Sequence, residues 1–369
     1  MRFSVNGRFL TQQTTGVQRY ATELLYALDR MLDGQSDIKI TVWSPRLRGP
    51  KPAWRNLLHR EAGRLSGNLW EQLELPFLSR GDLLFCPGNT APIISLAGFQ
   101  PVVVTVHDLS YAYFPDAYSR TFRLWYHIVI PLAMRKAEIV LTVSETERES
   151  ITSHFPCVIG RIHTVPNGGW PRDHMPSPVA PPPRDDGSVL YVGSLSKRKN
   201  FPAMLDVAIS LARKRGLRFR FVGGTATSLA PAERIVPSDV KELIRFEGQT
   251  NDLETLARYY LEAGCFLFAS LFESSGLPPV EAMACGCPVV ASDTPALRER
   301  CGEAAVYCDP HSKGSISSAI EELVDSSERR SKMTELGYAR ARQLSWENCA
   351  AMTLELLAGH TKSRRKPAA

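Results

Sequence analysis

Short runs of apolar residues alternate, in the first half of the chain, with longer segments in which apolar residues recur at helical spacing. The short runs have the length and β-branched composition of buried strands, and the longer segments have those of amphipathic helices. The predicted strands are 38–43, 82–86, 102–106 and 139–143, and the predicted helices are 17–32, 69–78 and 119–136. Such alternation predicts a mostly parallel α/β sheet covered by helices.

The same alternation starts again after a proline-rich stretch at 165–187, whose composition interrupts both helix and sheet. Beyond it, the predicted strands are 189–192, 219–222, 243–246, 265–269 and 288–291, and the predicted helices are 201–215 and 253–261. We therefore predict two doubly wound, Rossmann-like domains that face a central cleft. They comprise residues 1–170 and 188–343, with a hinge at 171–187 and a C-terminal segment at 344–369.

Composition narrows the class of protein without choosing a reaction. Hydrophobic residues make up 44% and charged residues 22% of the 369 residues, which excludes a disordered or fibrous chain. No stretch approaches the roughly 18 apolar residues of a membrane-spanning helix, and the first residues lack the apolar run of a signal peptide. The eight cysteines are scattered, mostly within apolar runs, which predicts buried free thiols. We expect a cytoplasmic protein that does not bind nucleic acid.

Basic residues gather between Trp43 and Gly63, where a single acid, Glu61, accompanies Arg46, Arg48, Lys51, Arg55 and Arg60. Apolar residues at 54, 57 and 58 have helical spacing. Two interpretations stay open for this segment. One is a basic, aromatic-bearing surface that contacts the anionic inner face of the cytoplasmic membrane. The other is an ordinary solvated loop and helix.

Two carboxylates flank a predicted helix start in the segment 271–284. Glu273 and Gly276 lie in the loop after the strand at 265–269, Pro279 is suited to the first helical position, and Glu281 falls in the first turn. A helix N-terminus at the carboxyl end of a strand suits a phosphate. The acids beside it would accept hydrogen bonds from sugar hydroxyls. Favourable placement in the helix dipole would explain Glu281 alone. It does not explain Glu273, Gly276 and Glu281 occurring together with the proline pair.

Three cations follow the first strand of the second half, in the segment 191–200. Gly193 ends the strand, and Lys197, Arg198 and Lys199 stand where the next helix starts. Arginine binds phosphate bidentately and lysine binds it as a point charge. A solvated basic loop would be the default interpretation of three cations in isolation, but the position at a carboxyl end favours phosphate binding.

The first half offers two further candidates. Gly16 opens a helix after the first apolar strand, so backbone N–H groups there can approach an anion. His107 follows the strand at 102–106, where it could bind a hydroxyl or move a proton, or could be structural.

These segments resemble motifs of glycosyltransferase family 4, whose members have the GT-B fold and transfer a sugar from a nucleotide-sugar donor with retention of configuration. Segment 273–281 resembles the Glu-x7-Glu signature, in which the first Glu contacts the donor sugar and the second the ribose. Segment 193–200 resembles Gly-Ser-Leu-x-x-Arg-Lys-Asn, whose Arg and Lys bind the diphosphate. The resemblance implies these donor-binding residues: Gly16, Gly193, Arg198, Lys199, Glu273, Gly276, Leu277 and Glu281. It implies these catalytic residues: His107, Arg198, Lys199 and Glu273.

This sequence departs from the family pattern at several positions. Ser274-Ser275 stands where many relatives have Gly-Phe, Lys197 stands where they often have proline, and Thr15 replaces the second glycine of the N-terminal loop. The resemblance implies that the first departure would alter the sugar pocket and that the last would change how closely the loop approaches the diphosphate.

The resemblance implies an acceptor-binding N-terminal domain, a donor-binding second domain, and a helix after 344 that crosses back to the first domain. It also implies catalysis without a metal. No Asp-x-Asp triplet, typical of metal-dependent transferases, occurs in the sequence. The N-terminal half is similar to bacterial mannosyl- and rhamnosyltransferases of polysaccharide assembly, which favours GDP-mannose as donor and a growing polysaccharide or lipid-linked glycan as acceptor. A UDP- or dTDP-sugar donor stays open.

Two other function classes remain at this point. A dinucleotide-dependent oxidoreductase would need a Gly-x-Gly-x-x-Gly turn, and the sequence has none. A catalytically silent nucleotide-sugar-binding protein would retain the same residues, and only turnover separates it from an enzyme.

Overall fold

The computed structural model describes residues 1–35, 37–115, 118–171, 184–224, 236–250 and 252–365. The chain forms two compact units. Unit 1 comprises Met1–Pro115, Ser119–Asn167 and Trp346–Ala369, and unit 2 comprises Asp116–Tyr118 and Gly168–Ser345. Most of the predicted hinge, residues 172–183, lies outside the described residues.

Unit 1 is built on a seven-stranded parallel sheet with the order β3-β2-β1-β4-β5-β6-β7. Its strands are β1 (Arg2–Asn6), β2 (Lys39–Ser44), β3 (Leu58–Glu61), β4 (Leu83–Cys86), β5 (Val102–Thr105), β6 (Ile139–Thr142) and β7 (Ile162–Thr164). The strands β4, β5 and β6 are buried along their whole length, as the continuous apolar runs require.

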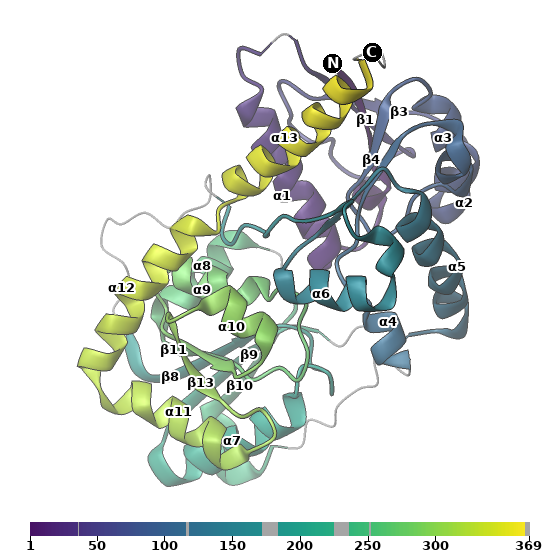
Figure 1. Cartoon of the computed structure of the whole chain (residues 1–369). Helices are drawn as coiled ribbons and strands as arrows, with labels where there is room; N and C mark the ends of the chain where they lie inside the picture. The colour runs from purple at the N-terminus through teal and green to yellow at the C-terminus, as the bar shows by residue number, and fades with distance from the viewer. Residues whose placement is uncertain (36, 116–117, 172–183, 225–235, 251, 366–369) are drawn as a thin grey trace. The chain divides into compact units, whose positions relative to one another are not determined.

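Helices cover both faces of this sheet. They are α1 (Gly16–Met31), α2 (Gly67–Leu73), α3 (Leu75–Leu78), α4 (Ser110–Tyr113), α5 (Arg120–Lys136), α6 (Glu145–His154) and α13 (Trp346–Arg365), with the short turns η1 (Arg8–Thr11), η2 (Ser95–Phe99) and η4 (Pro156–Val158). Helix α1 connects β1 to β2, toward the β3 edge of the sheet. Helices α2 and α3 lie between β3 and β4, and α5 lies between β5 and β6, so these connections run toward the β7 edge. Right-handed connections therefore place them on opposite faces. Figure 1 shows α1 beside α13 on one side and α2, α3 and α5 on the other.

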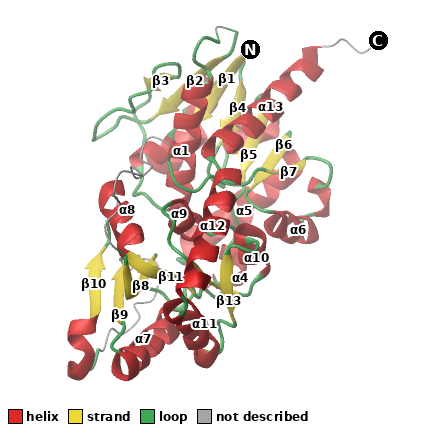
Figure 2. Ribbon diagram, turned by 90° about the vertical axis from the view of Figure 1, so that its left-hand side faces the viewer, coloured by secondary structure: helices red, strands yellow, loops and turns green. Residues whose placement is uncertain are grey.

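Unit 2 is built on a six-stranded parallel sheet with the order β10-β9-β8-β11-β12-β13. Its strands are β8 (Asp185–Val192), β9 (Arg218–Val222), β10 (Ile244–Gly248), β11 (Ala263–Phe268), β12 (Val289–Ser292) and β13 (Ala305–Cys308). Its helices are α7 (Phe201–Arg215), α8 (Leu253–Glu262), α9 (Leu277–Ala284), α10 (Pro295–Cys301), α11 (Lys313–Asp325) and α12 (Ser327–Gln343), with the turn η6 (Ser238–Leu243). Figure 2 shows the strands of this sheet with the helices around them.

The prediction of two doubly wound parallel α/β domains is confirmed. The helical interpretation of residues 54–60 is wrong: the segment is a loop that leads into the edge strand β3, which pairs in parallel with β2. The Asp29 carboxylate explains the loop, because it accepts hydrogen bonds from the backbone N–H groups of residues 55, 56 and 57.

The cysteine prediction holds with one exception. All eight thiols are free, and Cys157 is exposed whereas the other seven are buried. Within the described residues, no helix is both long enough and apolar enough to cross a bilayer.

Candidate functional site

The sheet of unit 2 reverses its strand order between β8 and β11. At such a point, the chain leaves the two neighbouring strands in opposite directions, and the loops after their carboxyl ends flank a space where ligands of doubly wound sheets bind. The loop after β8 contains Gly193, Arg198 and Lys199, and the loop after β11 contains Glu273 and Gly276. The fold therefore brings both predicted donor-binding motifs to one place.

The loop after β8 is held tightly at both ends. Gly193 has a φ of 155° and donates its N–H to the carbonyl of Val222 at 2.9 Å. At the other end, Asn200 takes a left-handed conformation with a φ of 60°, and its side-chain amide donates to the carbonyls of Ala269 (2.9 Å) and Pro310 (2.7 Å). The loop is thus fixed before any ligand binds, which lowers the entropic cost of binding.

An ion pair joins the two loops. The Lys199 ammonium contacts the Glu273 carboxylate, and their side chains are only 13% and 7% exposed. The ammonium also lies 5.2 Å from the centre of the Phe268 ring. Lys199 therefore carries a positive charge at the predicted phosphate position and holds Glu273 in a fixed place.

Arg198 is anchored to the same loop by both its ends. Its guanidinium donates to the carbonyl of Phe272 at 3.2 Å, and its backbone carbonyl accepts from Leu271 at 3.1 Å. The neighbouring Lys197 is exposed.

Tyr191, at the end of β8, is buried behind this loop. Burial raises the pKa of Tyr191, and the negative charge of the nearby Glu273 adds to the rise. The Tyr191 hydroxyl donates to the carbonyl of Ser194 at 2.9 Å.

The helix after β11 begins earlier than the sequence indicates. Gly276 is the N-terminal cap with a φ of 77°, and α9 starts at Leu277, so the expectation that Pro279 is the first helical residue is wrong. The first N–H groups of a helix have no intrahelical partner, so α9 accommodates prolines at its second and third positions. As a consequence, Glu281 lies beyond the first turn rather than in it.

Glu281 is almost completely buried, with 1% exposure. The hydroxyl of Tyr260, on α8, donates to its carboxylate at 3.1 Å. A buried Arg300 supports the start of the same helix, because its guanidinium donates to the carbonyls of Gly276 (3.3 Å) and Gly168 (2.9 Å). Sequence reasoning missed Tyr260 and Arg300, since neither lies within a recognised motif.

The end of β9 packs directly against the donor loop. Gly223 has a φ of 148°, and a Cβ atom there would overlap the backbone carbonyl of Gly193. We expect Gly223→Ala to lower the free energy of unfolding by at least about 2 kcal/mol, because a backbone clash adds to the strain of the dihedral angle. Urea denaturation measures this difference.

A matched control is Gly216→Ala at the end of α7. Gly216 also has a positive φ, 67°, but a Cβ atom there meets nothing within 4 Å. It should lose about 1 kcal/mol, the cost of the left-handed conformation alone. Equal losses in the two variants would contradict the close approach of the two loops.

Unit 1 has its own reversal of strand order, between β1 and β4. His107 follows the neighbouring strand β5 and is buried, with 5% exposure. Its Nε2 lies 2.8 Å from the carbonyl oxygen of Pro87, and its backbone N–H donates to the Asn89 side chain at 2.7 Å. A carbonyl only accepts, so Nε2 carries the proton and Nδ1 is left as the acceptor. Burial lowers the pKa of His107, which favours this neutral form.

A carboxyl group that the sequence reasoning did not single out contacts the chain two residues after this histidine. Glu147, on α6, is buried and accepts the backbone N–H of Leu109 at 3.1 Å. Burial, reinforced by the nearby Asp108, raises the pKa of Glu147 to about 8. Asp108 itself accepts the N–H of Ser110 at 2.9 Å. Glu147 is the third residue of α6, which Ser144 caps by accepting the backbone N–H of Glu147. No motif in the sequence marks this position.

Gly16 is the first residue of α1, as predicted. Its Cβ position is open, with no atom within 4 Å, so packing inside unit 1 does not demand a glycine. The preceding residue, Thr15, forms a capping box with Gln18.

The basic segment between Trp43 and Gly63 exposes its cations but not its aromatic rings. Trp54 is half-buried and packs edge-on against Tyr26, and Trp43 lies under the guanidinium of Arg60 at 5.6 Å. Lys51 pairs with Glu61 at 2.9 Å. The segment thus has the charge of a membrane-binding surface without exposed aromatic anchors, and membrane contact through it stays a prediction.

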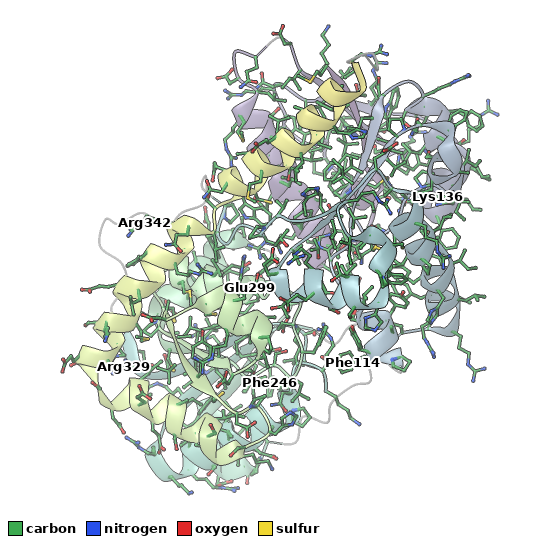
Figure 3. The ribbon with its side chains drawn as sticks, in the orientation of Figure 1. Phe114, Lys136, Phe246, Glu299, Arg329 and Arg342 are labelled. Atoms are coloured by element: carbon green, nitrogen blue, oxygen red, sulfur yellow. The ribbon has the colours of Figure 1, made fainter. Side chains whose placement is uncertain are left out.

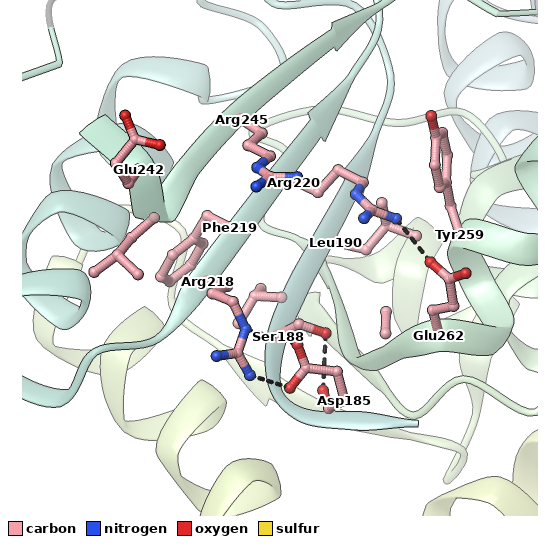
Figure 4. Close-up of a pocket in the computed structure, with 13 residues that line it drawn as sticks. Asp185, Ser188, Leu190, Arg218, Phe219, Arg220, Glu242, Arg245, Tyr259 and Glu262 are labelled. Carbon is pink, nitrogen blue, oxygen red and sulfur yellow. Dashed lines mark hydrogen bonds and ion pairs between the residues drawn. The ribbon is translucent and has the colours of Figure 1, made fainter. Parts of the chain in front are cut away.

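A hollow on unit 2 lies on the sheet face near the amino halves of β8, β9 and β10 (Figure 4). Two of the arginines that line it pair with carboxylates: Arg218 pairs with Asp185, and Arg220 pairs with Glu262 at 3.1 Å. Ligands of doubly wound sheets bind at the carboxyl ends instead, so this hollow is not the candidate site.

Comparison with known proteins gives consistent matches. Residues 14–168 match the family described as "Glycosyltransferase Family 4", and residues 177–340 match "Glycosyl transferases group 1". The O-antigen chain mannosyltransferase B of Escherichia coli is 30% identical over 266 residues, 69% of each chain. The O-antigen chain mannosyltransferase RfbU of Salmonella typhimurium is 26% identical over 60% of each chain.

Solved structures show the same fold. Sucrose-phosphate synthase from Thermosynechococcus elongatus superimposes with a TM-score of 0.75 at 19% identity, covering 98% of this chain and 100% of that one. WaaG, a glycosyltransferase involved in lipopolysaccharide biosynthesis, gives a TM-score of 0.68 at 16% identity and covers 97% and 99% of the two chains.

Proposed function

Because this chain belongs to glycosyltransferase family 4 and has the GT-B fold, we propose that it transfers mannose from GDP-mannose to a growing polysaccharide or lipid-linked glycan, with retention of configuration. The family and fold predictions are confirmed, and the chain is a glycosyltransferase of glycan biosynthesis. The donor, the acceptor and the stereochemistry are the proposed parts.

The observation that carries the proposal is the Lys199–Glu273 ion pair beside Arg198, at the carboxyl ends of β8 and β11. During transfer, the bond between the anomeric carbon and the phosphate oxygen breaks, and negative charge gathers on the leaving diphosphate. Arg198, Lys199 and the N-terminus of α9 would stabilise that charge where it develops. Glu273, fixed by Lys199, would orient the sugar.

Retention follows if the acceptor hydroxyl attacks the face that the diphosphate leaves. The leaving phosphate then accepts the proton of that hydroxyl, so no protein base is required at Glu273. The residues proposed to bind the donor are Gly16, Gly193, Arg198, Lys199, Glu273, Gly276, Leu277 and Glu281, and His107 is proposed to bind a sugar hydroxyl.

The choice of mannose rests on the curated relatives, two of which are O-antigen mannosyltransferases. We expect GDP to raise the Tm of the protein more than UDP or dTDP does at equal concentration, because ligands that bind only the native state stabilise it. Differential scanning fluorimetry with the three nucleotides side by side measures the shift. A rise in Tm with UDP or dTDP alone would contradict GDP-mannose as the donor. It would not contradict glycosyl transfer from another nucleotide sugar.

Turnover separates an enzyme from a silent binding protein. Incubation with GDP-mannose and a lipid-linked glycan acceptor should release GDP. A protein that binds several nucleotide sugars but releases nucleotide from none would contradict the proposed activity.

A further inference from the structure

The ring of His107 packs against an aromatic side chain from another element of unit 1. The Tyr20 ring, on α1, meets the His107 ring edge-to-face, with ring centres 4.6 Å apart and an interplanar angle of 84°. Aromatic pairs prefer this arrangement, because the positive edge of one ring faces the negative face of the other. Tyr20 is fully buried and His107 is almost so. The contact therefore belongs to the interior of unit 1.

Tyr20 has two further contacts that hold it in place. Its hydroxyl lies 3.4 Å from the hydroxyl of Thr105, a buried residue at the end of β5. The ring of Trp346, which is also buried, lies 6.0 Å from the Tyr20 ring at an angle of 61°. Three aromatic rings thus follow one another inside unit 1, from Trp346 through Tyr20 to His107. We call these three residues the aromatic column.

The aromatic column connects the C-terminal helix to the segment that follows β5. Trp346 is the first residue of α13, and the chain returns from unit 2 to unit 1 at this residue. Helix α13 packs along α1 (Figure 1). The segment after β5 contains His107 and α4, and it reaches Phe114, which Figure 3 labels.

The other contacts of His107 leave one motion of its ring unrestrained. The Asn89 side chain accepts the backbone N–H, and Nε2 lies 2.8 Å from the carbonyl oxygen of Pro87. A single hydrogen bond at one ring atom allows the ring to tilt, and a tilt would displace Nδ1, the atom left to accept a hydroxyl. The contact with Tyr20 opposes this tilt and keeps the ring against the Pro87 carbonyl. Such restraint matters for a rate, because a displacement of about 1 Å can lower it by about 10²-fold.

We propose that Tyr20, supported by Trp346, is a positioning residue that holds the imidazole ring of His107 where Nδ1 accepts a sugar hydroxyl. The inference depends on the role that the proposed function gives to His107. It gives α13 a part in transfer as well as in stability, because the first side chain of α13 supports Tyr20. The Tyr20 hydroxyl is not required, since the ring makes the contact with His107.

Substitutions at Tyr20 test the role of the ring through steady-state release of nucleotide in the presence of acceptor. Tyr20→Phe keeps the ring and should retain kcat within about twofold, whereas Tyr20→Leu should lower kcat about tenfold or more. Trp346→Leu should lower kcat by a smaller factor. In a His107→Gln background, Tyr20→Leu should cause no further loss, because residues that act through one group are not additive. An additive loss in this double variant would overturn the proposal.

Leu28→Ala is the matched control for lost packing. Leu28 is buried on the same helix, about two turns beyond Tyr20. This variant should also lower the Tm, but it should leave kcat unchanged at a temperature below the unfolding transition of every variant. Equal losses of kcat in Leu28→Ala and Tyr20→Leu would mean that packing alone matters, which would overturn the proposal.

A measurement without substrate separates failure of this proposal from failure of the proposed function. Nitrogen NMR of protein labelled at the histidine ring nitrogens reports which nitrogen carries the proton, and the His107 signals are those lost in His107→Gln. The unsubstituted protein and Tyr20→Phe should carry the proton on Nε2 alone, whereas Tyr20→Leu should show exchange between both tautomers. Unchanged His107 signals in Tyr20→Leu would overturn the positioning role alone. Full kcat in His107→Gln would instead contradict the role of His107 in transfer, and the positioning role with it.

Discussion

Replacing Arg198 with alanine is expected to lower kcat by roughly 10²–10³-fold. Its guanidinium, held by the Phe272 carbonyl, would face the diphosphate on which charge develops as the sugar leaves. A positive group that meets charge mainly in the transition state changes kcat more than substrate affinity. Steady-state release of nucleotide from the donor, in the presence of acceptor, measures kcat and KM separately.

Lys197→Ala is the matched control for this variant. Lys197 has the same charge type as its two neighbours and belongs to the same loop, but its side chain is exposed. It should therefore change kcat little. Equal losses in Lys197→Ala and Arg198→Ala would mean that the loop acts only through its net charge, which would contradict the assigned role of Arg198. A kcat of Arg198→Ala equal to that of the unsubstituted protein would contradict it as well.

The fold was predictable from sequence where apolar periodicity was continuous. The helix predicted at 201–215 is α7 with the same bounds, and the strand runs at 102–106 and 139–143 correspond to β5 and β6. The segment 54–60 was not predictable, because three apolar positions at helical spacing also occur by chance over so short a length. Its loop depends on Asp29, far away in sequence, whose carboxylate fixes the turn.

The candidate site likewise has residues that could be predicted from the sequence and residues that could not. The donor motifs were recognisable because Gly193 and Gly276 lie in loops that follow strands, and cations or acids lie in the same loops. The supporting residues were not recognisable. Arg300 reaches the Gly276 carbonyl from another helix, and the pKa of Glu147 is raised because the folded protein buries its carboxyl near Asp108. Such contacts join positions distant in sequence, and no local pattern signals them.

Glu147 makes a large pH dependence of stability testable. Its pKa is raised from 4.5 to about 8 in the folded protein, so the folded state binds the proton more tightly than the unfolded state does. The stability that this proton contributes is complete below about pH 4.5 and is lost as the pH rises through about 8. Over that window, this carboxyl lowers the free energy of unfolding by up to about 1.4 kcal/mol for each pH unit.

Glu147→Gln removes the titration while keeping the side-chain oxygen that accepts the N–H of Leu109. The variant should therefore gain stability relative to the unsubstituted protein as the pH rises from 5 to 8, measured by urea denaturation at a series of pH values. Glu145→Gln is the control, because its exposed carboxyl has a pKa lowered by hydrogen bonds to Thr164 and Arg148 and does not titrate in this window. A constant difference between Glu147→Gln and the unsubstituted protein across the window would show that Glu147 is already ionised in the folded state.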